Sequence, residues 1–140
     1  MKSNKGFTLI ELLAVIVILA IIALIATPMI LGVVETARKG AAESSVLGFV
    51  DAVEKQVMIN ELEENAIVDG TYAVASANNG ATLTGSGTAA GKTYTVEVKG
   101  EVPTADSMEI SSGQVATTTF TLNSYTVTYN KSTGKASATK

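Results

Sequence analysis

The sequence predicts an α+β protein in which one long N-terminal helix packs against a C-terminal antiparallel sheet. Residues 7–34 are almost wholly apolar, which favours a continuous helix. Residues 93–140 alternate apolar and polar side chains with a period of two, which is typical of strands with one buried face. Between these segments, four valines share one helical face: Val46, Val50, Val53 and Val57.

The apolar segment is long enough to cross a membrane. At ~1.5 Å per residue, residues 7–34 would form a helix of roughly 42 Å, whereas a bilayer core is about 30 Å thick. Lys2 and Lys5 precede it, so we expect the N-terminus to stay in the cytoplasm. An ordinary secretory signal peptide has a shorter apolar run and a small-x-small cleavage site, and this segment has neither.

Glu11 is an ionisable residue one turn inside this segment. A charge in a membrane costs a few kcal/mol and usually has a functional partner. Cleavage after Gly6 would create one, because the new amino group of Phe7 lies four residues from Glu11. The amine of one subunit and the carboxylate of its neighbour could then neutralise each other in an apolar bundle. Such a pair would also penalise misaligned stacking and so set the axial register.

The same stretch resembles the prepilin motif of type IV pilins and type II secretion pseudopilins. The matching residues are a short basic leader ending in Gly6, then Phe7-Thr8-Leu9-Ile10-Glu11, and Leu12-Leu13 opening an apolar helix that reaches Pro28. The resemblance implies the pilin fold, and short connections between the alternating segments of residues 93–140 predict an antiparallel β-meander of about four strands. It implies that a membrane prepilin peptidase cuts between Gly6 and Phe7 and N-methylates Phe7. It further implies that Glu11 guides each subunit into the growing filament.

Pro28 and Gly32 are expected to soften the helix. Proline removes one backbone hydrogen bond, and glycine adds flexibility. A plain kink in a transmembrane helix is the alternative interpretation. The resemblance implies that residues 28–32 lose helicity on assembly and make the filament extensible.

The expected organisation has five parts: a cleaved leader (1–6), a transmembrane and filament-core helix (7–34), an amphipathic stalk helix (35–65), a connecting loop region (66–92) and an antiparallel sheet (93–140). A short strand is expected at residues 71–75 of the loop region. In the sheet, strands are expected around residues 94–98, 108–110, 116–122 and 125–129, with a marginal fifth at 135–139. Leu47 and Met58 are expected to widen the valine stripe.

Composition argues against an enzyme. The chain has no cysteine and no histidine, which excludes thiol catalysis and removes the commonest general base and metal ligand. We therefore expect no catalytic residue, metal or cofactor. An acidic group is interpreted as a solvated helix end: Glu61, Glu63, Glu64 and Asp69. The many threonines are interpreted as strand formers rather than as an ice- or sugar-binding surface.

The expected function is that of a structural subunit, the major pilin, of a type IV pilus used for adhesion, aggregation or twitching motility. Implied partners are other copies of the chain, minor pilins, the prepilin peptidase, and the assembly platform with its ATPases. The chain would begin in the cytoplasmic membrane and end in a cell-surface pilus, and the disulfide-free head resembles Gram-positive pilins. Nucleic-acid binding has no support from the net charge of −3.

Three alternatives remain open. The first is a secretion pseudopilin, although residues 130–140 lack the acidic calcium-binding loop usual in that group. The second is a pseudopilin for DNA uptake, whose usual cysteine pair is missing. The third is a membrane-anchored monomeric binding protein that keeps its leader.

Overall fold

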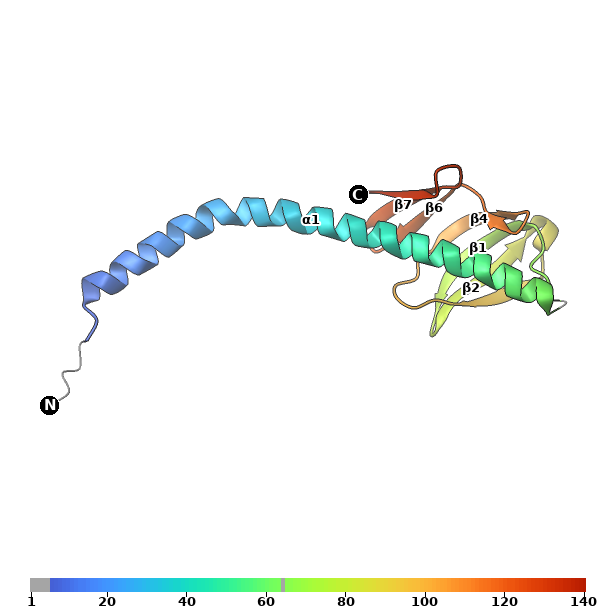
Figure 1. The fold of residues 1–140 in the computed structure, drawn as a ribbon, viewed down its shortest axis with the longest axis horizontal. Helices are drawn as coiled ribbons and strands as arrows, with labels where there is room; N and C mark the ends of the chain where they lie inside the picture. Colours follow the sequence, from blue (N-terminus) through green and yellow to red (C-terminus); the bar gives the residue numbers. More distant parts are fainter. Residues whose placement is uncertain (1–5, 64) are drawn as a thin grey trace. The chain divides into compact units, whose positions relative to one another are not determined.

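A computed structural model describes residues 6–63 and 65–140 as one long helix followed by eight strands (Figure 1). Helix α1 spans Leu9–Leu62, close to the expected helix of residues 7–65. The α+β class is confirmed, with more strands than expected. The strands are β1 (Gly70–Ala77), β2 (Gly80–Ser86), β3 (Thr93–Glu97), β4 (Ala105–Ser111), β5 (Gln114–Val115), β6 (Thr118–Leu122), β7 (Tyr125–Asn130) and β8 (Lys135–Thr139), with a 3₁₀ turn, η1, at Gly87–Ala89.

The chain divides into two compact units, with the boundary between Ala37 and Arg38. In the first unit, the large apolar side chains of α1 are exposed, as Leu24 at 79% illustrates. The helix continues through Pro28 and Gly32. A threonine hydroxyl donates to a carbonyl one turn earlier on either side of this stretch, from Thr27 to Ala23 at 2.7 Å and from Thr36 to Gly32 at 3.0 Å.

The second unit, Arg38–Lys140, is called the head and has its own hydrophobic core. Among the described residues, the buried apolar side chains begin at Ala42 and end at Ala138. The expected valine stripe of α1 is buried, and the Phe49 ring meets the edge of the Phe120 ring with centroids 5.5 Å apart. The expectation for Met58 was wrong, because its side chain is 62% exposed. It lies one position beyond Val57, where the helix surface turns away from the sheets.

The strands form two sheets rather than one meander. The larger has the order β3-β2-β1-β4-β5, and the smaller has the order β6-β7-β8. An isolated bridge between Thr104 and Thr121 connects them. The expectation that consecutive strands pair holds for β6, β7 and β8 but not for β3 and β4. The segment after β3 crosses the sheet, so that β4 pairs with the free edge of β1.

The short strand expected at residues 71–75 lies within β1. The rest of the connecting loop expected at residues 66–92 was wrong, because β1 and β2 form a hairpin there. Tyr72 and Val74 from β1 and Leu83 from β2 are buried in the core. Tyr72 also packs edge-on against Tyr94 of β3 at a centroid distance of 6.0 Å. The abundance of Ala, Gly, Ser and Thr suggested a loop. Strands tolerate these small side chains here because Tyr72, Val74 and Leu83 supply the packing.

Candidate processing and assembly site

The residues before α1 are exposed and outside regular structure. Gly6, Phe7 and Thr8 are not helical, and the Phe7 side chain is 90% exposed. The Gly6–Phe7 peptide bond therefore lies two residues before the first helical residue, Leu9. A bond in exposed, irregular backbone is open to a peptidase, whereas a bond inside the helix would require unwinding first.

Thr8 and Glu11 form a capping box at the start of α1. The Thr8 backbone N–H donates to Glu11 Oε2 at 2.9 Å, and the Thr8 hydroxyl donates to the same oxygen at 2.8 Å. In return, the Glu11 backbone N–H donates to Thr8 Oγ1 at 3.3 Å. The Leu12 N–H then donates to the Thr8 carbonyl, which starts the helical pattern. Backbone donors that the helix cannot satisfy internally are thus paired.

The sequence interpretation missed this role of Thr8. Its signal was present, because a Ser or Thr followed three residues later by Glu or Gln ahead of an apolar run is the capping-box pattern. Glu11 therefore has a partner within its own chain, and its place inside an apolar segment does not by itself require a partner from a second subunit.

The capping box also leaves Glu11 able to bind a cation. Both bonds from Thr8 end on Oε2, whereas a carboxylate can accept about four hydrogen bonds. The box holds the carboxylate beside the Thr8 backbone nitrogen, one residue from the nitrogen of Phe7. Placement of a negative charge in the first turn is also favourable to the helix dipole.

The helix that follows is long and apolar enough to cross a membrane, by length and composition, and its most apolar window is uncovered by the rest of the chain. Pro28 and Gly32 both lie in helical backbone in this single chain. Lys2, Lys5 and the rest of the expected leader before Gly6 lie outside the described residues, as does Glu64. Glu61, Glu63 and Asp69 are exposed, and Asp69 Oδ2 accepts the Ser112 N–H at 2.9 Å.

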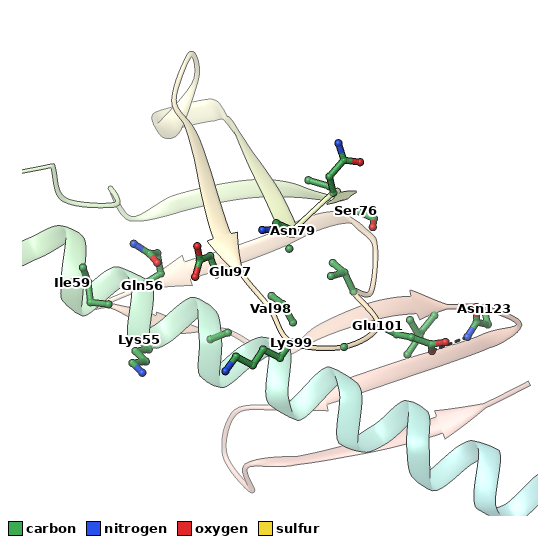
Figure 2. A pocket seen from close by; sticks show the side chains of 17 residues that line it. Lys55, Gln56, Ile59, Ser76, Asn79, Glu97, Val98, Lys99, Glu101 and Asn123 are labelled. Carbon is green, nitrogen blue, oxygen red and sulfur yellow. Dashed lines mark hydrogen bonds between the residues drawn. The ribbon is translucent and has the colours of Figure 1, made fainter.

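The head carries a separate groove of about 940 Å³ between α1, the β1–β2 turn and the segment after β3 (Figure 2). Gln56 comes from the helix, Glu97 from the end of β3 and Asn79 from the turn. Its polar side chains are partly fixed by hydrogen bonds, with Asn123 donating to Glu101 at 3.0 Å and Gln56 to Asn60 at 2.7 Å.

The charges that line this groove balance. Lys55 and Lys99 offset Glu97 and Glu101, and the remaining lining is a mixture of amide and aliphatic residues with Ser76 and two glycines. Across the described residues, no group of three or more His, Cys, Asp and Glu residues is placed to hold a metal ion. The groove is thus a neutral, polar depression on the head, and none of its lining residues belongs to the capping box.

Comparison with known families finds a match in the N-terminal segment. The family model of the prokaryotic N-terminal methylation motif matches residues 1–27, and this motif is the signature of type IV pilins and pseudopilins. The match covers the Gly6–Phe7 bond and the capping box. A search of curated proteins and a search of solved structures gave no match. The chain therefore carries the N-terminal signature that pilins and pseudopilins share, on an α+β head.

Proposed function

We propose that the chain is a structural subunit, and specifically a major subunit, of a type IV pilus. The observation that carries this proposal is the contrast between the two parts of α1. Its first part exposes apolar side chains along its whole length, whereas its second part buries a valine stripe in the head. A surface of that size requires either lipid or other copies of the same helix as its surroundings.

The motif supports the following processing steps. Prepilin peptidase removes residues 1–6 by cutting the exposed Gly6–Phe7 bond, and the Phe7 amine is methylated. The Glu11 carboxylate, held by Thr8, then receives the Phe7 amine of a neighbouring subunit as the apolar helices enter the filament core. Before assembly the N-terminus lies in the cytoplasm and the helix spans the membrane. The pilus then serves adhesion, aggregation or twitching motility.

Intact-mass spectrometry of surface filaments sheared from cells that express the chain tests the proposal. We expect filaments that consist mainly of this subunit, with a mass lowered by residues 1–6 and raised by one methyl group. A full-length chain found only in the membrane would favour the anchored monomer. A processed chain absent from surface filaments, but required for secretion or DNA uptake, would favour a pseudopilin.

A further inference from the structure

The outward side of the smaller sheet carries hydroxyl side chains in two registered rows. One row runs Thr121–Thr126–Thr139 across β6, β7 and β8, and the bridge from Thr121 to Thr104 adds a fourth member. The second row runs Thr119–Thr128–Ser137. All seven side chains are exposed. We call this surface the hydroxyl face, and it consists of Thr104, Thr119, Thr121, Thr126, Thr128, Ser137 and Thr139.

Sheet geometry makes this a regular array. Neighbouring strands lie ~4.8 Å apart, and side chains on the same face of one strand recur every ~6.8 Å. The first row therefore places four hydroxyls on a line of roughly 14 Å. The opposite side of these strands points into the core, where Phe120 and Val127 are fully buried. The packing below thus fixes the backbone that carries each hydroxyl.

The hydroxyl face carries almost no charge. In β6, β7 and β8 the charged side chain that faces the same way is Lys135, at the hairpin end of β8, and Asp106 lies two residues beyond Thr104. The larger sheet differs, because the exposed positions of its strands include Glu97 and Glu109. The strand propensity of threonine explains why these strands form. It does not require every central outward position to be uncharged, and we therefore revise the interpretation of these threonines as strand formers alone.

The hydroxyls are weakly engaged. Thr119 and Thr128 approach at 3.4 Å, and the hydroxyls of Thr104 and Thr139 reach backbone carbonyls at 3.3 Å. These distances exceed the usual ~2.7–2.8 Å of a bond donated by a hydroxyl. The remaining hydroxyls of the face have no hydrogen-bond partner in residues 6–63 and 65–140. Each hydroxyl offers one donor and two acceptor lone pairs, so the array can exchange these long bonds for better ones.

We propose that the hydroxyl face binds an extended, neutral polysaccharide, laid along the row from Thr104 to Thr139. One sugar unit of an extended chain is close in length to the strand spacing, so successive units would each meet one threonine. The threonine hydroxyls supply hydrogen bonds, and their methyl groups contact the C–H faces of the sugar rings. A neutral ligand matches a face without charge, since no ion has to be desolvated on binding.

Binding at the hydroxyl face does not depend on the proposed function, although assembly into a filament would increase its strength. A single face with a few exposed hydrogen bonds binds weakly. Many copies on one polymer would bind a long polysaccharide with much higher avidity. The test therefore uses the unassembled full chain at a density that gives several copies per particle.

Retention of proteoliposomes on cellulose particles measures the binding. The full chain is reconstituted in phospholipids without sugar headgroups, and beads that carry helical amylose serve as the non-extended comparison. We expect retention on cellulose, weak retention on amylose, and about a tenfold loss for the pair Thr121→Val and Thr126→Val, which removes two hydroxyls and keeps the side-chain shape.

The matched control is the pair Thr93→Val and Thr95→Val on the exposed side of β3, which should leave retention unchanged. Circular dichroism melting checks that each variant folds. If the first pair fails to fold, Thr128→Val with Ser137→Ala tests the second row instead. The proposal is overturned if the unaltered chain is not retained on cellulose, if both valine pairs behave alike, or if amylose binds as well as cellulose.

Discussion

Glu43 Oε1 accepts a hydrogen bond from the backbone N–H of Ala138 at 2.8 Å, so a helix side chain covers the outer edge of β8. Glu54 does the same for the larger sheet, because its Oε1 accepts the Val115 N–H of β5 at 3.1 Å. The two glutamates are about three helical turns apart on α1. One helix face thus satisfies edge donors of both sheets, which would otherwise be free to pair with another chain.

Replacement of Glu43 by alanine should lower the free energy of unfolding of the head by about 1–3 kcal/mol, because the Ala138 N–H loses a charged acceptor in a partly buried place. Glu43→Gln should cost less, since the amide oxygen can still accept. Urea denaturation of the detergent-solubilised chain measures both. Glu61→Ala is the control, as Glu61 is exposed on the same helix. Equal stability of the Glu43 and Glu61 alanine variants would contradict the role of this bond.

Gly6→Ala should stop processing. The Gly6–Phe7 bond lies in exposed, non-helical backbone. A failure to cut the variant would therefore mean that the peptidase requires glycine at this position, and not that the bond is inaccessible. We expect full-length precursor in the membrane and few filaments, measured by immunoblot and electron microscopy. A normal yield of processed pili would refute the assignment of the cleavage bond.

The capping box allows the helix cap and the charge of Glu11 to be tested separately. Glu11→Gln keeps an oxygen that can accept from Thr8, and Thr8→Val keeps the carboxylate but removes the hydroxyl. We expect both variants to be processed, Glu11→Gln to assemble poorly, and Thr8→Val to assemble. Hydrogen exchange should be faster at the start of α1 in Thr8→Val, because loss of a cap costs about 1 kcal/mol.

Thr8→Ser restores the hydroxyl and is the control for the cap. The charge is dispensable if Glu11→Gln assembles normally. The cap itself is required for assembly if Thr8→Val fails while Thr8→Ser succeeds.

Gly80 is needed for the close approach of the β1–β2 turn to β3. Its φ is +149°, and a Cβ atom there would lie 2.0 Å from the Val96 carbonyl oxygen. Gly80→Ala should therefore destabilise the head by at least ~2 kcal/mol in urea denaturation. Gly48→Ala is the opposite case, because nothing lies within 4 Å and helical Ala is favoured over Gly by about 0.5–1 kcal/mol. A neutral Gly80→Ala would show that the turn can move aside.

Alkaline pH should lower the stability of the head through its buried tyrosines. Burial, then the neighbouring Tyr94 and Asp69, raise the pKa of Tyr72 above its ordinary value of 10.0. Burial, then Glu54 and Asp51, raise the pKa of Tyr129 in the same direction. The unfolded chain therefore loses these protons first. Their contribution to stability is complete below pH 10 and is lost as the pH rises through the folded pKa values.

The measurement is the free energy of unfolding between pH 8 and pH 11, taken by urea denaturation. It should fall with pH above about 10, where unfolded tyrosine ionises. Tyr72→Phe should be less stable at neutral pH, because the Tyr72 hydroxyl donates to the Val68 carbonyl, and should show a shallower fall. An identical slope in the variant would mean that other groups cause the alkaline loss.

Periodicity predicted the parts of the fold in which large apolar residues recur. The valine stripe of α1 and the alternation around Phe120 and Val127 are both buried as expected. A short strand was expected at residues 71–75 and lies within β1. Strand β2 and its hairpin with β1 were missed, because the alternation rests on few large residues, among them Tyr72 and Leu83, in a background of small ones. Pairing of β4 with β1 could not be predicted from adjacency, since it joins strands that are not consecutive.

The motif at the candidate processing site was recognisable in the sequence, but the hydrogen bonds between its residues were not predicted. The spacing of Gly6, Phe7 and Glu11 pointed to cleavage and assembly. The bonds between Thr8 and Glu11 followed from a capping pattern that was equally visible in the sequence. The two-row array of the hydroxyl face could not be seen beforehand, because it depends on the register between strands.

The motif match ends at residue 27, and the buried core of the head begins at Ala42. No described core side chain comes from the part of the chain that the motif covers, so the two parts can evolve separately. Under the proposed function, a peptidase and neighbouring helices constrain the first, while internal packing constrains the core of the second. Proteins that share this N-terminal motif can therefore diverge in their heads until only the N-terminal sequence shows that they are related.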